Sequence, residues 1–285
     1  MSELHGQSWG SGPVTVLAIH GITASSAAWS AVAAALPESW RLVAPDLAGR
    51  GHSRDLPGPW GLRRHVADVC DLAAELGPCV LLGHSMGAYV ASLAAAERPQ
   101  LFEKVVLVDG GIPLPMSEGV DPDEVLAATL GPALARLRET YADQDAYVDF
   151  FRAHPALGPH WNDTIEAYVR YDSMPTGNGP TGNGPTGDGV RSRALEEAVR
   201  QDGRELLVHQ AEFDAALRAA QPGTRLLVAP MGMFGEPPGL LPAEAVAAYG
   251  AEVANLSVET VPDVNHYTIL FDPAAAARVA AAATA

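Results

Sequence analysis

The sequence predicts an α/β fold: a mostly parallel, doubly wound sheet covered by helices on both faces and interrupted by a helical insertion. Short apolar runs alternate with Ala-rich helical segments up to residue 113, and the alternation returns after residue 222. Strands that are buried on both faces of a parallel sheet have such near-continuous apolar runs. The chain has 285 residues, of which 48% are apolar, and this is enough for one large domain with an insertion.

The positions of the predicted strands and helices follow from the apolar runs and from the spacing of the apolar residues. The apolar runs predict strands, with one short strand expected near residues 3–10 and the others at 14–20, 40–46, 79–85, 104–109, 225–230 and 256–262. Segments rich in Ala, or with apolar residues three and four apart, predict helices at 26–37, 62–76, 86–98, 242–253 and 273–283.

Between residues 114 and 221 the rhythm of apolar strands stops, and helical segments carry most of the Tyr and Phe. We therefore expect a core formed by residues 1–113 and 222–285, with residues 114–221 inserted as a helical lid. The insertion contains TGNGPTGNGPTGDG at 176–189. Frequent Gly raises the entropy cost of ordering this repeat and Pro blocks regular pairing, so we expect a mobile surface loop.

Charge and cysteine content exclude several classes of function. The formal charge of −16, from 34 acidic and 18 basic residues, argues against nucleic acid and anionic membranes as partners. The two cysteines, Cys70 and Cys79, are expected to be buried free thiols, and they cannot build a metal cluster. We expect no metal and no cofactor. Neither a signal peptide nor a transmembrane helix is apparent, which favours a cytoplasmic protein.

The strongest motif is Gly83-His84-Ser85-Met86-Gly87, a G-x-S-x-G. An apolar strand precedes it and a helical run follows it, which is the context that a nucleophile elbow requires. A sharp strand-to-helix turn would expose the Ser85 hydroxyl at the carboxyl end of the sheet. The backbone N–H of Met86, at the start of the helix, could then face a developing oxyanion.

A second segment, His20-Gly21-Ile22, ends another predicted strand. Gly21 would let the chain turn so that the Ile22 N–H faces the same oxyanion as Met86. We expect His20 to make structural hydrogen bonds rather than act as the base. Both His20 and Trp29 are candidate substrate-binding residues, and Trp29 and Met86 are candidate walls of an acyl pocket.

These segments resemble the α/β-hydrolase superfamily, in its lid-bearing branch of esterases and lipases. The resemblance rests on HGITAS, PDLAGRGHS (45–53), GHSMGAYVA, VVLVDGG and VPDVNHYTIL, which occur in the expected order from about residue 14 to the end. It implies the α/β-hydrolase fold and a serine nucleophile, Ser85. Epoxide hydrolases and dehalogenases of this superfamily have Asp at the elbow, so Ser85 argues against both.

The resemblance also implies the general base. His266 follows the last predicted strand, and it is the only His after residue 209. The family often has Gly before this His, where the present chain has Asn265. Asn can adopt left-handed backbone conformations, so the replacement of Gly by Asn265 is compatible with this loop.

The triad acid has two candidates. The family usually places it after the strand that follows the lid, at the end of G-x-x-D, but here Gly232-Met233-Phe234 leads to Gly235. Glu236 comes one residue late, although its longer side chain could reach back. Relatives also use the end of the strand after the nucleophile helix, which is Asp109. We favour Asp109, because it lies one strand spacing from Ser85 and needs no shifted geometry.

The remaining polar and aromatic residues have structural interpretations. Asp46, Arg50 and His52 are expected to fix a loop near the mouth of the site. The aromatic residues of the insertion are expected mainly to form the core of the lid, with some lining the cleft; they are Tyr141, Tyr147, Phe150, Phe151, Trp161, Tyr168 and Tyr171.

The sequence thus predicts a carboxylic-ester hydrolase for a small or medium apolar substrate, acting through an acyl-enzyme. A C–C bond hydrolase, lactonase or perhydrolase of secondary metabolism would use the same Ser and His, so these alternatives stay open. A non-catalytic ligand-binding receptor on the same scaffold is a third alternative.

Overall fold

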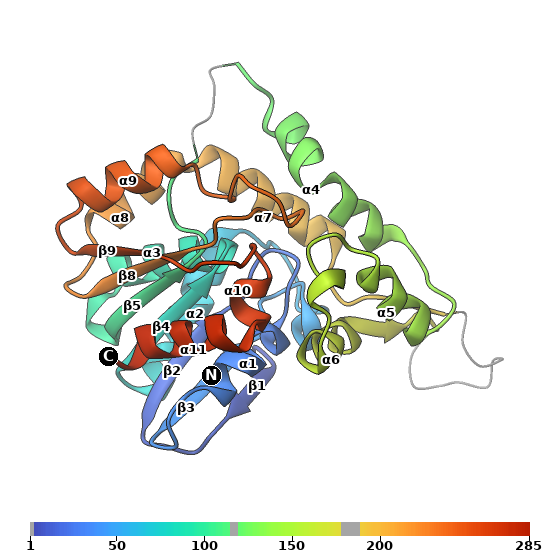
Figure 1. Ribbon diagram of the computed structural model, residues 1–285, viewed down its shortest axis with the longest axis horizontal. Helices are drawn as coiled ribbons and strands as arrows, with labels where there is room; N and C mark the ends of the chain where they lie inside the picture. Colours follow the sequence, from blue (N-terminus) through green and yellow to red (C-terminus); the bar gives the residue numbers. More distant parts are fainter. Residues whose placement is uncertain (1–2, 115–118, 178–188) are drawn as a thin grey trace.

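The computed structural model describes residues 3–114, 119–177 and 189–285, and its centre is a seven-stranded sheet of order β1-β3-β2-β4-β5-β8-β9 (Figure 1). The strand β1 pairs antiparallel with β3, and all other neighbouring strands are parallel. The predicted mostly parallel sheet is therefore confirmed. The strands are β1 (Gly6–Trp9), β2 (Val14–Ile19), β3 (Trp40–Pro45), β4 (Cys79–His84), β5 (Phe102–Val108), β8 (Thr224–Val228) and β9 (Leu256–Thr260).

Helices cover both faces of this sheet, as the doubly wound prediction requires. They are α1 (Ser30–Ala34), α2 (Leu62–Leu76), α3 (Met86–Glu97), α9 (Ala243–Glu252), α10 (Thr268–Phe271) and α11 (Pro273–Thr284), with short 3₁₀ turns at Ser26–Trp29, Gly51–Ser53 and Pro99–Leu101. The helix predicted at 26–37 is shorter than expected and divides into a 3₁₀ turn and α1. Pro37 contributes to its early end, because the residue before a proline disfavours helical backbone.

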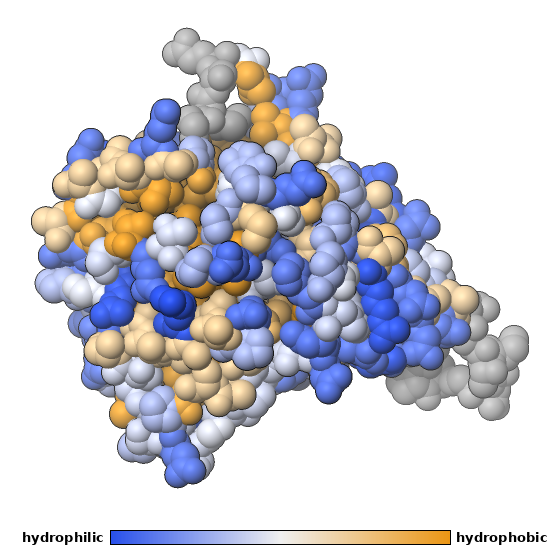
Figure 2. All heavy atoms as spheres, in the orientation of Figure 1, coloured by the Kyte–Doolittle hydropathy of each residue, from blue (hydrophilic) through white to orange (hydrophobic). Residues whose placement is uncertain are grey.

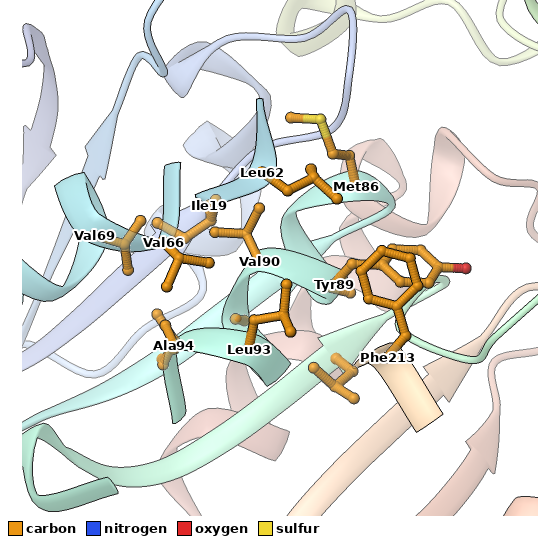
Figure 3. Close-up of a cluster of buried hydrophobic side chains, with 14 of the residues drawn as sticks. Ile19, Leu62, Val66, Val69, Met86, Tyr89, Val90, Leu93, Ala94 and Phe213 are labelled. Atoms are coloured by element: carbon orange, nitrogen blue, oxygen red, sulfur yellow. The ribbon is translucent and has the colours of Figure 1, made fainter. Parts of the chain in front are cut away.

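The central strands bury both of their faces in two separate cores. Leu17 and Ile19 of β2 face the core under α2 and α3, whereas Val16 and Ala18 face the core under α1 and α11. Figure 3 shows the first core, where Val66 and Val69 of α2 lie against α3. Both cysteines are buried and free, as predicted.

The chain between β5 and β8 forms the insertion beside the sheet (Figure 1). Its elements are α4 (Pro122–Arg138), α5 (Gln144–Arg152), a 3₁₀ turn (Gly158–His160), α6 (Asp163–Asp172), the hairpin β6 (Ser173–Pro175) and β7 (Val190–Ser192), α7 (Glu196–Val208) and α8 (Gln210–Arg218). The side chains of Asp121, Asp143 and Asn162 cap α4, α5 and α6.

The last helix of the insertion, α8, belongs to the layer that covers the sheet. The ring of Phe213 on α8 packs edge-on against Tyr89 of α3, with ring centroids 4.8 Å apart. The part of the insertion that extends beyond the sheet layers therefore ends with α7. The repeat at 176–189, for which we expected a mobile loop, lies almost wholly outside the described residues.

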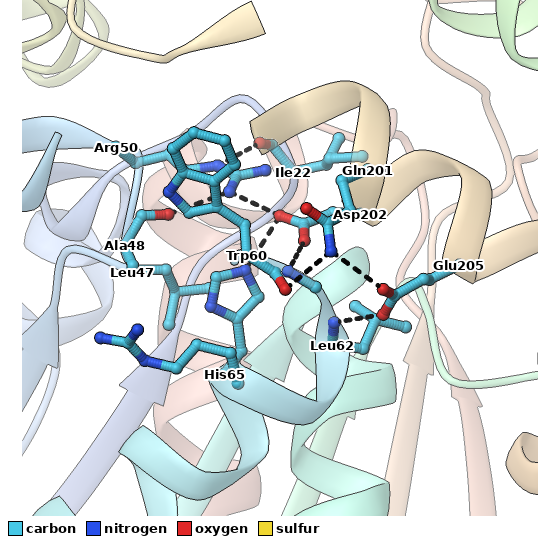
Figure 4. A network of polar contacts seen from close by, with 12 residues as sticks. Ile22, Leu47, Ala48, Arg50, Trp60, Leu62, His65, Gln201, Asp202 and Glu205 are labelled. Atoms are coloured by element: carbon cyan, nitrogen blue, oxygen red, sulfur yellow. Dashed lines mark hydrogen bonds and ion pairs between the residues drawn. The ribbon is translucent and has the colours of Figure 1, made fainter. Parts of the chain in front are cut away.

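A buried polar network ties α7 to the core (Figure 4). The carboxylate of Asp202 on α7 lies 2.5 Å from Nη1 of Arg50 and 2.9 Å from Nε2 of His65. It also accepts a hydrogen bond from the Gly61 backbone N–H. The side chains of all three network members, Arg50, His65 and Asp202, are completely buried. A buried charge is tolerated only when it is paired and hydrogen-bonded, so Arg50 depends on this carboxylate.

The outer surface differs between the two parts of the chain. In Figure 2, polar residues dominate over the insertion, whereas apolar residues gather around α9 and the neighbouring strands. That area includes the groove between α9 and the edge strand β9, which is lined by Val246, Leu256 and Val258. Within the described ranges, no helix combines the length and the apolar character needed to cross a bilayer.

Asp202→Asn should lower the free energy of unfolding by about 3–5 kcal/mol, because it leaves the buried Arg50 cation without its counter-charge. Urea unfolding would measure the change. Asp123→Asn is the matched control. It breaks the exposed pair between Asp123 on α4 and Arg204 on α7, the helix that also carries Asp202; the side chains of Asp123 and Arg204 are 58% and 55% exposed. The control should change stability by less than about 1 kcal/mol. Equal effects of the two substitutions would contradict this account of the network.

Candidate active site

Ser85 occupies a strained turn between β4 and α3. Its φ of 54° and ψ of −122° place a non-glycine residue in a sparsely populated backbone region. The turn is possible because its neighbours lack side chains. A Cβ on Gly87 would lie 2.1 Å from the Ile19 carbonyl oxygen, and one on Gly110 would lie 2.3 Å from that of Ser85. A Cβ on Gly83 would likewise lie 2.1 Å from the Gly87 carbonyl oxygen, so both glycines of the G-x-S-x-G motif have a steric cause.

Asp109 and His266 are brought together over a long sequence separation. Asp109 directly follows β5, and its Oδ2 lies 2.7 Å from Nδ1 of His266. The other carboxylate oxygen accepts a hydrogen bond of 3.0 Å from the Ala229 N–H beyond the end of β8. Asp109 is completely buried and His266 almost so. The carboxylate therefore fixes the orientation of the imidazole and leaves its Nε2 available for chemistry.

Glu236, the alternative acid, is exposed on its loop, where its backbone carbonyl accepts a hydrogen bond from Gly232. The expected family position holds Gly235 with a φ of 81°. A Cβ there would lie 3.1 Å from Cα of Ala156 in the insertion. Both the backbone conformation and this close approach disfavour an aspartate at the usual place.

Asn265 holds the His266 loop by its side chain, and its backbone does not need the left-handed conformation that Asn can adopt. The described non-glycine residues with positive φ are Ser85, Asp109 and Asp263. The Asn265 side-chain oxygen accepts hydrogen bonds from the N–H groups of Tyr267 and Thr268, at 2.9 and 3.0 Å. Its amide nitrogen donates to the carbonyl of Ala156 in the insertion.

His84, the variable residue before Ser85, also contacts the His266 segment. The Nε2–H of His84 donates to the His266 carbonyl at 2.8 Å, and the two rings lie 4.7 Å apart. Burial, followed by the nearby His266, keeps the pKa of His84 well below its usual value, so the ring is neutral. The motif does not reveal this contact from sequence, because it specifies no residue type at this position.

The predicted oxyanion segment lies against Ser85. A Cβ on Gly21 would lie 3.2 Å from Cβ of Ser85, so the chain passes close to the nucleophile there. In the described part of the chain the Ile22 N–H has no acceptor, and the Met86 N–H belongs to the first turn of α3, where intrahelical partners are absent. Both residues line the same cavity as Ser85.

His20 and Arg50 support this segment from behind. The Nδ1–H of His20 donates to the Gly21 carbonyl at 2.7 Å, and its Nε2 accepts from the Leu47 N–H at 3.0 Å. The Nε–H of Arg50 donates to the Ile22 carbonyl at 3.0 Å (Figure 4). His20 therefore has the expected structural role and does not line the cavity, contrary to its inclusion among the substrate-binding candidates.

The loop of residues 45–53 is fixed as predicted. Asp46 is completely buried, and its carboxylate accepts hydrogen bonds from the N–H groups of Ser26 and His52, at 2.7 and 2.9 Å. It also accepts a hydrogen bond of 2.7 Å from the hydroxyl of Tyr171 on α6. This last bond is a second tie between the insertion and the core, and the aromatic pattern of the insertion did not predict it.

A cavity of about 230 Å³ opens over Ser85 and His266. Its walls are mainly apolar and come from both parts of the chain, with Val125, Leu126, Leu130, Leu206 and Leu207 from the insertion and Met86, Leu240, Leu270 and Phe271 from the core. Of the seven insertion aromatics singled out above, Tyr168 lines this cavity. Met86 is a wall, as predicted.

The expectation for Trp29 was wrong. Its side chain is completely buried in the core under α1, and Ala28 reaches the cavity in its place. The turn at Ser26–Trp29 is a 3₁₀ helix, so neighbouring residues point in different directions and only one of the two faces the site. Within residues 3–114, 119–177 and 189–285, no three His, Cys, Asp or Glu side chains are grouped so that they could hold a metal ion.

Comparison with known proteins agrees with this architecture. The model of the family described as "Alpha/beta hydrolase family" matches residues 16–282. The chain therefore belongs to the α/β-hydrolase family, a family of hydrolytic enzymes.

Individual relatives match smaller parts of their own length. Lipase LipV of Mycobacterium tuberculosis is 39% identical over 152 residues, which is 50% of this chain and 58% of the lipase. A pimeloyl-[acyl-carrier protein] methyl ester esterase of Vibrio campbellii is 34% identical over 38% of this chain and 41% of the esterase. The matched segments thus span less than two thirds of either relative.

Solved structures share the fold over almost the whole chain. The structure of E-2-(acetamidomethylene)succinate hydrolase has a TM-score of 0.76 at 23% identity and covers 97% of this chain and 93% of its own. A thioesterase domain from the curacin biosynthetic pathway has a TM-score of 0.73 at 23% identity and covers 98% and 94%.

Acidification should destabilise the fold in part through His20, because burial lowers its pKa from 6.5 to about 4. Between these two values the unfolded chain binds a proton that the folded chain excludes. The stability contributed by neutral His20 is therefore complete above pH 6.5 and is lost as the pH falls towards 4, by on the order of 3 kcal/mol. Urea unfolding of wild type and His20→Gln at several pH values would measure it. The variant should lose less stability across this window, and parallel curves would contradict the role of His20.

Proposed function

We propose that this protein is a serine hydrolase that cleaves carboxylic esters of a small or medium apolar substrate through an acyl-enzyme. The observation that carries the proposal is the 2.7 Å contact between Asp109 and His266, at a cavity that Ser85 and His266 both line. Ser85 directly follows β4, Asp109 directly follows β5, and His266 lies in the loop after β9; a nucleophile, a base and an acid of these types are what nucleophilic catalysis by serine needs. The mainly apolar cavity walls favour an apolar acyl group.

In the proposed mechanism, Nε2 of His266 takes the proton of the Ser85 hydroxyl as Oγ attacks the ester carbonyl. The backbone N–H groups of Ile22 and Met86 donate hydrogen bonds to the oxyanion that develops. Asp109 accepts from Nδ1–H of His266, which holds the reactive tautomer and stabilises the imidazolium. His266 then protonates the leaving alcohol, and the same base activates a water molecule that hydrolyses the acyl-enzyme.

We further propose that the insertion, predicted as residues 114–221, acts as the lid of this site. Side chains of α4 and α7 form much of the cavity wall. Hydrogen bonds from Tyr171 to Asp46 and from Asn265 to Ala156 connect it with the loops of the core that carry the site. A lid of this kind excludes water from the developing charges.

The names of the relatives support an ester substrate, since one is a lipase and another a methyl ester esterase. A C–C bond hydrolase, lactonase or perhydrolase would use the same three side chains, and a receptor could retain them without turnover. We propose a cytoplasmic enzyme that needs neither metal nor organic cofactor. The proposed acyl-enzyme mechanism needs only the three catalytic side chains, the two backbone N–H groups and water.

The Ser85→Ala variant should lose turnover of p-nitrophenyl esters by several orders of magnitude while its unfolding transition stays cooperative, because one hydroxyl carries the covalent step. A panel of esters of increasing chain length measures the activity. A fluorophosphonate probe should label the wild type at Ser85, with the variant as its control. Labelling elsewhere, or an active variant, would refute the assignment. Labelling at Ser85 without turnover of any ester would favour the other reactions or the receptor.

Asp109→Asn should reduce kcat by about 10⁴-fold, the loss known for the equivalent change in a serine protease, because His266 then takes the wrong tautomer. Glu236→Gln is the matched control and should stay close to wild type, since this side chain is exposed. Kinetics on the best ester of the panel would compare them. A crippled Glu236→Gln beside a nearly normal Asp109→Asn would show that Glu236 is the acid.

A further inference from the structure

A second cavity of about 80 Å³ adjoins the one over Ser85. The two cavities share part of their walls, including Thr23, Leu130, Tyr168, Met233 and Tyr267. We call the second one the side cavity. A substrate held at Ser85 could therefore extend into it past the two tyrosines. Nothing in the proposed mechanism uses the side cavity.

The tyrosines at this junction offer unused hydroxyl groups. Burial raises the pKa of Tyr267 to about 12 and also raises that of Tyr168, so both hydroxyls stay protonated near neutral pH. The rings of both residues pack against other rings. The ring centroid of Tyr168 lies 5.1 Å from that of Phe271, and the ring centroid of Tyr267 lies 5.6 Å from that of His154. Among the described residues, neither hydroxyl has a hydrogen-bond partner.

The wall of the side cavity also includes a positively charged side chain. Arg136 lines it and is 6% exposed, and its Nη1 donates to Asp172 at 3.0 Å and to the hydroxyl of Tyr147. No acceptor for its Nε and Nη2 is found in the described ranges. Asp172 itself lies outside the cavity wall and accepts from Arg136, Tyr147 and Ser192. Arg136 therefore lines the side cavity, whereas its ion-pair partner Asp172 does not.

His154 supplies a further donor to the same wall. Its Nδ1 accepts a hydrogen bond of 3.2 Å from the Ala156 N–H, so the proton of the neutral ring is on Nε2. Burial, and after it the nearby Arg136, lowers the pKa of His154, which favours the neutral ring. The wall of the side cavity thus has several donors. Asp172 is not part of this wall; its Oδ2 accepts the three hydrogen bonds given above, and its Oδ1 is buried without a partner in the described part of the chain.

We propose that the side cavity binds a hydrogen-bond-accepting carbonyl group, a carboxylate or an amide, at the distal end of the acyl group. This inference rests on the serine hydrolase proposed above and adds to it the substrate class, an acyl ester with a distal acceptor. A plain alkyl end would leave the two tyrosine hydroxyls and the Nε and Nη2 groups of Arg136 without acceptors. An ammonium group would be repelled by Arg136, and because it is itself a donor it could not accept hydrogen bonds from these groups.

The test compares p-nitrophenyl esters whose acyl chains are matched in length and differ at the distal end. The ends are carboxylate, amide, methyl and ammonium, over lengths from succinyl to sebacyl. At the length that fits, kcat/KM for the carboxylate- or amide-terminated ester should exceed that of the ammonium-terminated ester by at least about tenfold. A ratio near one at every length, or a preference for ammonium, would overturn the proposal.

Tyr168→Phe removes one hydroxyl and keeps the ring that packs on Phe271. It should lower the ratio between acceptor-terminated and methyl-terminated esters by about two- to tenfold. Tyr249→Phe is the control, because this tyrosine hydroxyl bonds Asp214 on the outside of the core, away from both cavities. An unchanged ratio in Tyr168→Phe, or an equal loss in the control, would contradict a role of the hydroxyl in binding.

Binding to the Ser85→Ala variant separates this proposal from the proposed reaction. Calorimetry with the free dicarboxylic acids, and with alkyl monoacids of the same length, needs no turnover. Tighter binding of the diacids, weakened by adding Tyr168→Phe, supports the side cavity even if no ester is hydrolysed. If methyl-terminated esters are turned over and diacids bind no better than monoacids, the reaction stands and the side cavity proposal fails.

Discussion

The close approach of three backbone segments at Ser85 is the constraint on which the site depends. Gly87 lets the start of α3 touch the end of β2, and Gly110 lets the chain after β5 pass the turn. A side chain at either position would separate the strands that carry Gly21 and Asp109 from Ser85. The positive φ of Ser85 is tolerated because the segments packed around it leave the turn no other path.

Two completely buried carboxylates organise what surrounds this turn. Asp109 holds His266 and thereby joins the ends of β5 and β8 to the last loop of the core. Asp202 holds Arg50, and Arg50 holds the carbonyl of Ile22 (Figure 4). Without its carboxylate, the partner of each pair would be buried and unpaired, so replacing either carboxylate should be costly. Through the second pair, the helix α7 of the insertion supports the same loop that offers its N–H to the cavity.

The chemistry of the two cavities is unequal. The main cavity has apolar walls and few polar atoms apart from Ser85 and the two histidines, which suits the burial of an acyl chain. The side cavity is lined by the donors Arg136, His154, Tyr168 and Tyr267, whereas Asp172, the ion-pair partner of Arg136, is not part of its wall. In the proposed site, an apolar path ends at donors that have no acceptor. Such donors would select the distal end of the acyl group by hydrogen bonding, which discriminates between substrates more strongly than apolar contact alone.

The sequence by itself determined the alternation of strands and helices along the chain, the mostly parallel sheet, and the strand-to-helix turn that carries Ser85. These features depend on local patterns, since apolar period, glycine spacing and a strand-to-helix turn are all read within a few residues. The resemblance to the α/β-hydrolase superfamily predicted His266 as the base and Asp109 or Glu236 as the acid. The strand order, with β5 beside β4, agrees with the choice of Asp109. Tertiary structure decided the rest. The burial of Trp29 is one such feature. The bond of Asn265 to Ala156, the contact of His84 with His266 and the pairing of Arg50 with Asp202 join residues that are adjacent only after folding. No local pattern encodes such contacts, because they depend on which way each side chain points once the two parts of the chain have packed together.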